Sequence, residues 1–244
     1  MIEISNLTKT YANSQKKAVN NISFTVSDGE IFGFLGPNGA GKSTTIKCIT
    51  GILGYDSGSI LINGMNLKDD PIATKKKIGY VPDEHIIYDA LTCFQYLNFI
   101  CNVFEIDESK RLDKINKYAT DFEMDDKLGM RIAALSHGMK QKLSIIAALI
   151  HDPEVFILDE PMTGLDPKSS FKLKLIMNEY VSQGKTVFFS SHVLDVVEKI
   201  CTEIAIIDKG RLITICDLKD LEARSDLTLE NLFLNLTSES ELKI

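Results

Sequence analysis

The chain has 244 residues, of which 44% are apolar and 25% are charged, a composition typical of soluble globular proteins. This length allows one large domain or two small ones and is enough to bury a substantial core. The formal net charge of −7 argues against a broad electrostatic grip on nucleic acid, so we expect no nucleic-acid partner.

The five cysteines are widely spaced and include no C-x-x-C pair, which is typical of free thiols in a reducing cytosol. The opening MIEISNLTKT lacks a charged segment followed by an apolar one, so we expect no secretion signal there. The longest apolar run, 145–150, is far shorter than the roughly 20 residues needed to cross a bilayer. These features predict a cytoplasmic protein that serves any membrane process from outside the lipid.

The first part of the chain alternates between apolar and polar residues and contains a turn at Asp28-Gly29. This alternation predicts strands over residues 2–7, 21–26 and 30–35. Beyond residue 36 the pattern changes to strand, loop and helix in succession, which indicates a parallel α/β sheet.

Later apolar runs suit strands that helices cover on both faces, and they lie at residues 155–158, 186–189 and 204–207. Between about residues 84 and 134 no such run occurs, and the pattern predicts helices over 91–104 and 110–122. We therefore expect an α/β core with an inserted helical block.

Residues 36–43, GPNGAGKS, match the phosphate-loop pattern G-x-x-x-x-G-K-[ST] in full. The loop follows an apolar strand and begins a helix, whose expected core stripe is Ile46, Ile49 and Leu53. Glycines let backbone N–H groups surround phosphate oxygens, Lys42 would reach the β- and γ-phosphates, and Ser43 would hold Mg²⁺. The expected nucleotide contacts are Gly36, Asn38, Gly39, Ala40, Gly41, Lys42, Ser43 and Thr44.

Two acids, Asp159 and Glu160, directly follow the run 155–158, at the strand end where open α/β sheets bind ligands. Asp159 would orient Mg²⁺ through its water shell, and Glu160 would polarise the attacking water. His192 ends another strand-like segment and would contact the γ-phosphate while holding the water and Glu160 in place. With Lys42, Glu160 and His192 are the catalytic candidates.

A second helix start suited to anions lies in residues 135–143, LSHGMKQKL. Ser136 is a good N-cap, and residues 136–151 contain two lysines and no acid. The expected core stripe of this helix is Met139, Leu143, Ile146 and Ile150.

In their order and spacing, these motifs resemble the ABC ATPase family, whose signature loop reads L-S-G-G-Q at the position of residues 135–139. The resemblance covers nearly the whole chain. It implies a P-loop NTPase core with an N-terminal antiparallel β subdomain and an inserted α-helical subdomain at about 84–142. Residues 1–222 would form the nucleotide-binding domain and 223–244 a C-terminal tail.

The resemblance also assigns residues that the patterns alone do not. Tyr11 matches the aromatic residue that stacks on adenine, and Asp166 in Gly164-Leu-Asp166 matches the dimer-contact loop. Ser136 and Gly138 would contact the ATP held by a second ATPase subunit. The implied assembly is a head-to-tail dimer of this chain, or of this chain and a close relative, enclosing two ATP molecules.

Three positions depart from the family pattern. His137 replaces the first signature glycine, and Met139 replaces the signature glutamine. Asp83 stands where the family has a glutamine that touches Mg²⁺, and a carboxylate can ligate the metal but cannot donate a hydrogen bond. We expect Asp83 to keep the metal-sensing role with slower hydrolysis.

The expected function is an ATP-hydrolysing subunit that drives a separate integral-membrane permease from the inner face of the cell membrane. Export is favoured because residues 229–236 are similar to the ends of exporter ATPase subunits. A soluble, non-transport ABC ATPase, for example in Fe–S assembly, is the alternative. A P-loop kinase is disfavoured by the signature loop, Asp166 and His192.

Overall fold

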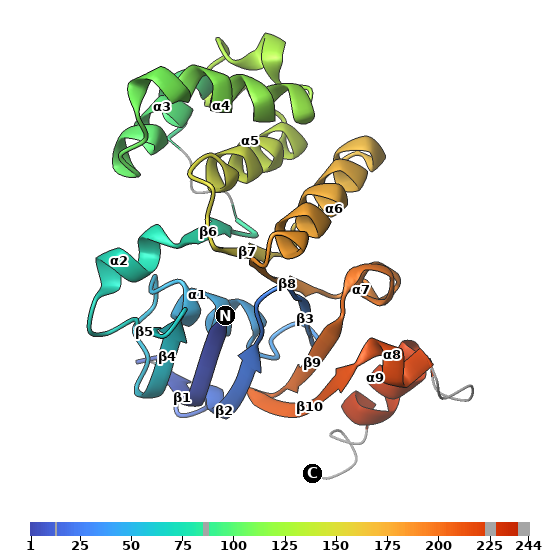
Figure 1. The fold of residues 1–244 in the computed structure, drawn as a ribbon. Helices are drawn as coiled ribbons and strands as arrows, with labels where there is room; N and C mark the ends of the chain where they lie inside the picture. Colours follow the sequence, from blue (N-terminus) through green and yellow to red (C-terminus); the bar gives the residue numbers. More distant parts are fainter. Residues whose placement is uncertain (13, 85–87, 223–227, 239–244) are drawn as a thin grey trace.

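The computed structural model describes residues 1–244 except 13, 85–87, 223–227 and 239–244. Its described strands form a four-stranded sheet and a six-stranded sheet, with a layer of helices above them in Figure 1. This arrangement confirms the predicted mixed α/β fold.

The smaller sheet has the strand order β2-β1-β4-β5 and is antiparallel. It consists of β1 (Ile2–Thr10), β2 (Lys17–Val26), β4 (Ser57–Ile62) and β5 (Met65–Asn66). The predicted strands at 2–7 and 21–26 are confirmed and are longer than expected. The N-terminal segment is therefore the antiparallel β part that the family resemblance implies.

The larger sheet has the order β10-β9-β3-β8-β7-β6, in which only β10 pairs antiparallel. Its strands are β3 (Ile31–Leu35), β6 (Ile78–Val81), β7 (Val155–Asp159), β8 (Thr186–Ser191), β9 (Glu203–Asp208) and β10 (Arg211–Asp217). The strands β3, β7 and β8 are buried along their whole length, as expected for strands covered on both faces. Their carboxyl ends lie side by side at one edge.

The helices around the larger sheet are α1 (Lys42–Ile49), α2 (Pro71–Lys76), α6 (Pro167–Ser182), α7 (Leu194–Ile200), α8 (Leu218–Glu222) and α9 (Leu229–Ser238). The helix α1 is shorter than expected, because Gly51 interrupts the segment with φ near +66°, and Leu53 lies beyond the helix end. Leu53 still packs against the apolar core from the loop that follows.

The inserted helical block contains α3 (Cys93–Val103), α4 (Glu108–Asp121) and α5 (His137–Leu149), the upper layer of Figure 1. Thr92 caps α3 because its hydroxyl accepts from Gln95 N at 3.1 Å. Among the described residues between 84 and 134 there is no strand, only an isolated bridge between Thr92 and Arg131. The two helices predicted here are confirmed within two residues at each end.

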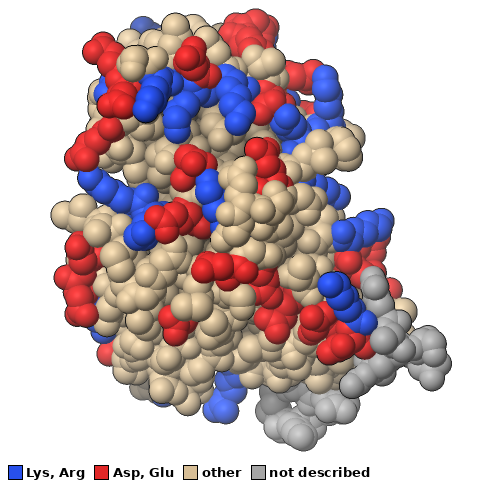
Figure 2. All heavy atoms as spheres, in the orientation of Figure 1, with Lys and Arg blue, Asp and Glu red and all other residues tan. Residues whose placement is uncertain are grey.

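The apolar core forms two clusters, one between the two sheets and one joining the larger sheet to the helices. Stacked rings of Phe24, Phe32 and Phe188 lie in the first cluster, with centroids 5.6 to 6.1 Å apart. In the helices described, no segment is both long and apolar enough to span a bilayer. Figure 2 shows acidic and basic side chains interspersed over the face in view.

Candidate active site

The loop between β3 and α1 is closely packed and needs its glycines. A Cβ atom on Gly36 would lie 2.3 Å from Ile207 O, and one on Gly41 would lie 2.5 Å from Ala18 O. Gly41 also has φ of +112° and is the N-cap of α1, where no described side chain makes a capping bond. The backbone N–H groups at this helix start are thus left for an anion to bind.

The Lys42 side chain is buried, with 7% of its surface exposed, and it lies across the loop. Its Nζ donates to Gly36 O at 2.6 Å and lies 3.8 Å from Glu160 Oε1. The buried ammonium group therefore has a carboxylate partner, as a buried charge requires. This ion pair brings together two predicted site residues that are far apart in the sequence.

Asp159 ends β7 and is almost fully buried, with 1% exposed. Its Oδ1 accepts from Ser190 Oγ at 2.6 Å, because Asp159 and Ser190 are paired in the parallel register of β7 and β8. Burial raises the pKa of Asp159, while hydrogen bonds from Ser190 and Ser43 oppose that rise and the charge of Asp83 adds to it. The sequence analysis missed Ser190, whose signal is its place near the carboxyl end of a buried strand.

These oxygen groups fit a magnesium ion. Ser43, Asp159 and Asp83 offer a hydroxyl and two carboxylates, and Mg²⁺ normally takes only one or two protein ligands besides phosphates and water. The described chain has no group of three or more His, Cys, Asp or Glu side chains arranged to hold a metal by itself. A cation shared with phosphates would offset the burial that raises the pKa of Asp159.

Glu160 directs its carboxylate back toward the site through an unusual backbone conformation, with φ of +50°. Its Oε2 lies 2.8 Å from His192 Nδ1, and its backbone N donates to Ser190 Oγ at 3.0 Å. His192 follows β8 directly. The structure therefore brings Glu160 and His192, two of the three catalytic candidates, into contact, as the sequence analysis predicted.

A cavity of about 340 Å³ gathers most of the predicted contacts at this sheet edge. Its lining residues are Tyr11, Ala18, Pro37, Asn38, Gly39, Gly41, Lys42, Ser43, Thr44, Asp83 and Glu160. Tyr11 stands at the loop, with its hydroxyl 3.2 Å from Thr44 Oγ1. Asp83 also lines an adjoining cavity of about 470 Å³, so it lies between the loop and a second hollow.

The start of α5 lies apart from this cavity. Ser136 caps the helix by accepting from Met139 N at 3.3 Å, and neither Ser136 nor Gly138 is among the described residues that line the cavity. Gly138 packs closely against the loop 160–166, since a Cβ atom on Gly138 would lie 2.4 Å from Gly164 O. Within one chain, the starts of α1 and α5 therefore do not line the same cavity.

Asp166 is engaged inside its own chain. Its carboxylate caps α6 by accepting from Ser169 N at 2.9 Å and pairs with Lys142 Nζ at 2.7 Å. The Lys142 ammonium and the Ser169 backbone hold the pKa of Asp166 well below its usual range. The ion pair between Asp166 and Lys142 holds the loop 160–166 against α5, a contact that the sequence analysis did not predict.

Comparison with known proteins agrees with this geometry. The linearmycin resistance ATP-binding protein LnrL of Bacillus subtilis is 37% identical over 227 residues, which cover 92% of this chain and 71% of that protein. The ABC-type transporter ATP-binding protein EcsA of Bacillus subtilis is 32% identical, covering 98% of this chain and 97% of that protein. A solved structure described as the ATP binding subunit of an ABC transporter superposes with a TM-score of 0.90 at 30% identity, covering 97% of this chain and 99% of that one.

The family model described as ABC transporter matches residues 19–163, which include the phosphate loop, the signature helix and the Asp159–Glu160 pair. Together with the relatives above, this match extends over more than half of the chain. The chain therefore belongs to the ABC transporter family, as an ATP-binding subunit that hydrolyses ATP.

Proposed function

We propose that this subunit dimerises around two Mg-ATP molecules to drive a separate integral-membrane permease, in the direction of export. The observation that carries the proposal is the separation of the two helix starts. The start of α1 lies at a cavity that Lys42, Asp83 and Glu160 also line. The start of α5 has no acid in its first turn, and its residues Ser136 and Gly138 do not line that cavity. A second subunit would supply the missing half of each site.

In the proposed reaction, the loop N–H groups and Lys42 bind the phosphates of ATP, and Tyr11 covers the adenine. A magnesium ion held through Ser43 and Asp159, with Asp83, would supply positive charge to the phosphate oxygens. Glu160 accepts a proton from the attacking water, and His192 keeps the Glu160 carboxylate in place through their 2.8 Å contact. Binding of ATP replaces the resting pairing of Lys42 with Glu160, which frees the carboxylate for this role.

The second subunit is proposed to bring Ser136 and Gly138 to the γ-phosphate. The α5 start resembles an anion site, because Ser136 and His137 are exposed there and the first turn of the helix contains no acid. Asp166 would reach the partner while remaining tied to Lys142. Both half-sites would then form only when two subunits meet head to tail.

A surface suited to a membrane partner lies on the helical block. Three large apolar residues of α3 are exposed, namely Phe94, Phe99 and Val103. Tyr96 and Ile100 of the same helix line a cavity of about 140 Å³, where the Tyr80 hydroxyl and His151 Nδ1 are buried with no hydrogen-bond partner among the described residues. An exposed apolar surface next to unsatisfied polar atoms is typical of a surface that another protein covers.

The proposed direction of transport draws on a relative. LnrL is named for resistance to linearmycin, and export of a toxic compound is one route to resistance. We place the subunit on the inner face of the cell membrane, with residues 1–222 as the nucleotide-binding domain and 84–142 as its helical subdomain. The proposed tail, 223–244, includes α9, while 223–227 and 239–244 lie outside the described residues.

The test is the mass in solution of Glu160→Gln, measured by light scattering with and without Mg-ATP. Removing the carboxylate should lower hydrolysis by roughly 10²- to 10⁴-fold and trap ATP, so the monomer should become a dimer only with nucleotide. ATP binding without any dimer, in the presence of the solubilised membrane partner, would contradict the shared site. Association with a soluble scaffold instead of a membrane protein would favour the alternative, a non-transport ABC ATPase.

A further inference from the structure

The helix that follows His192 has little support of its own. His192 is followed by α7, a helix of only seven residues that begins at Leu194. No described side chain caps its N-cap residue Val193, whose carbonyl accepts from Val196 N at 3.2 Å and from Val197 N at 3.4 Å. The backbone N of Val193 donates to Ser191 Oγ at 3.0 Å. So short a helix is unstable alone, so its position depends on what packs against it.

The helix α7 packs between the larger sheet and α9. On one side it meets β3, where a Cβ atom on Gly33 would lie 3.1 Å from Val197 Cγ1. The helices α7 and α9 also contact each other, and their partly buried apolar residues pack against the same buried core cluster. Those residues are Leu194, Val196 and Ile200 of α7 and Leu232, Phe233 and Leu236 of α9.

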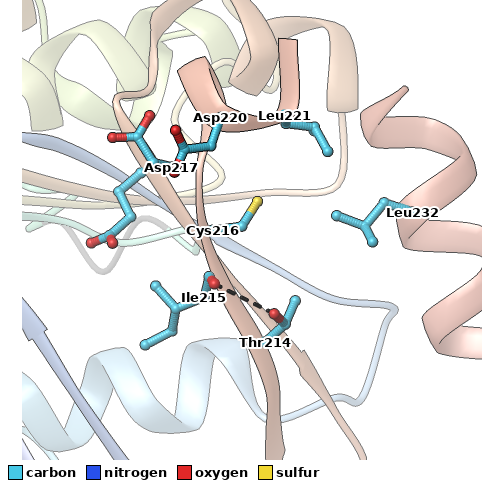
Figure 3. Close-up of a pocket in the computed structure, with 8 residues that line it drawn as sticks. Thr214, Ile215, Cys216, Asp217, Asp220, Leu221 and Leu232 are labelled. Carbon is cyan, nitrogen blue, oxygen red and sulfur yellow. Dashed lines mark hydrogen bonds between the residues drawn. The ribbon is translucent and has the colours of Figure 1, made fainter. Parts of the chain in front are cut away.

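A cavity of about 430 Å³ lies beside α9, between this helix, α8 and β10. Figure 3 shows Leu232 of α9 facing this hollow, opposite Leu221 and Cys216. The helix α9 is therefore incompletely packed toward β10. Phe233 is not among the lining residues of the hollow, and it packs into the cluster that includes α7.

We propose that α9 is a positioning element for His192, and that Phe233 is the positioning residue through which it acts. Phe233 holds α7 against β3, and α7 in turn holds the His192 ring 2.8 Å from Glu160 Oε2. This inference rests on the proposed role of His192 in hydrolysis. A shift of about an ångström in α7 is enough to misplace the ring, and such misplacements reduce turnover strongly. The C-terminal helix then sets the rate of ATP hydrolysis without touching nucleotide.

The test compares Phe233→Ala with Leu234→Ala in the full chain. Leu234 is the next residue of the same helix, and 53% of it is exposed, so its truncation removes a similar side chain from the surface. We expect Phe233→Ala to lower kcat by roughly 5- to 20-fold with the KM for ATP nearly unchanged, and Leu234→Ala to leave both unchanged. Phe233→Leu should restore most of the turnover, because it refills the contact.

A double-mutant cycle separates positioning from general destabilisation. On a His192→Ala background, Phe233→Ala should cause no further loss of kcat, because the group that it positions is already absent. An equal further loss on that background would overturn the inference, as would a kcat for Phe233→Ala equal to that of Leu234→Ala. If His192→Ala itself keeps full turnover, the proposed role of His192 fails, and the positioning role fails with it.

Discussion

The two helix starts that seek phosphate are built differently. Both lack an acid in the first turn, but α1 has Gly41 as its N-cap without a described capping side chain, whereas α5 is capped by Ser136. The first start therefore leaves its N–H groups entirely to a ligand, and the second satisfies one of them with its own hydroxyl. We infer that α1 binds nucleotide in the single subunit, and that α5 contacts only a nucleotide that is bound by a second subunit.

Their surroundings differ in the same sense. Lys42 at α1 is buried and paired with Glu160, and Asp159 ends β7 directly before Glu160. At α5 the close contact is with the loop 160–166, through Gly138 and Lys142. Acids lie near both helix starts, but at α5 Asp89 and Asp166 pair with Lys140 and Lys142 of the helix itself. A helix start can thus be suited to an anion without being a complete site.

The largest effect is expected from Lys42→Ala, which removes the charge from the complete site. ATP binding by the single subunit should weaken by roughly 10- to 100-fold, because the phosphates lose a charged partner. Equilibrium binding of a fluorescent ATP analogue measures this. Lys47→Ala is the control, since Lys47 lies on the same helix and lines the adjoining 470 Å³ cavity but not the 340 Å³ cavity. Equal losses for both variants would contradict a specific role for Lys42.

Ser136→Ala tests whether α5 serves the second subunit. The variant should lose about 1 kcal/mol of stability as a helix cap. In the Glu160→Gln background it should also weaken ATP-dependent dimerisation by roughly tenfold while ATP binding to the monomer stays the same. Thr92→Ala, which removes the cap of α3, is the control that lowers stability alone. If Ser136→Ala dimerises with ATP as well as Thr92→Ala does, the start of α5 does not contact the nucleotide of a second subunit.

A smaller effect is expected from Asp83→Gln, at the border between the complete site and the adjoining cavity. The substitution removes a negative charge that lies near Asp159 and near the expected position of the γ-phosphate. Turnover should therefore rise severalfold, and its dependence on Mg²⁺ concentration should change. Steady-state ATPase assays over a range of Mg²⁺ concentrations measure both. If neither quantity changes, Asp83 has no role in metal sensing or in slowing hydrolysis.

A separate effect, on stability and not on function, concerns His151, just beyond the far end of α5. Its ring stacks on Phe104 with centroids 3.6 Å apart, and burial lowers its pKa from 6.5 to about 4. Between pH 6.5 and about 4 the unfolded chain therefore binds a proton at His151 that the folded chain does not. The free energy of unfolding is unaffected by this residue above pH 6.5 and falls as the pH drops toward 4. Thermal unfolding between about pH 7.5 and 4.5 measures the slope, which should be shallower in His151→Phe.

Much of the fold was predictable because its strongest signals are local. The apolar runs before Asp159 and His192 predicted buried parallel strands, and Thr92 began a helix close to the predicted position. Four of the described strands were not predicted, namely β4, β5, β6 and β10. The strands β5 and β6 are only two and four residues long, and β10 is an edge strand whose residues are partly exposed, so none of these three gives a clear apolar pattern.

The site was predictable to the extent that its residues lie in contiguous motifs. The loop 36–44 and the pair Asp159 and Glu160 were evident, whereas Ser190 became apparent only from the register of β7 with β8. The pair between Lys142 and Asp166 joins two helices that are distant in sequence. Such contacts depend on the packing of elements against each other, and no local pattern reports that packing.

The left-handed backbone of Glu160 has a consequence for how this subunit tolerates change. A non-glycine residue at φ of +50° costs stability of about 1 kcal/mol or more, and the chain accepts this cost at the residue proposed to activate water. The substitution Glu160→Gly would relax the turn while removing the carboxylate, which would leave a well-folded but inactive subunit. Selection for a more robust fold and selection for faster turnover therefore act in opposite directions at this position.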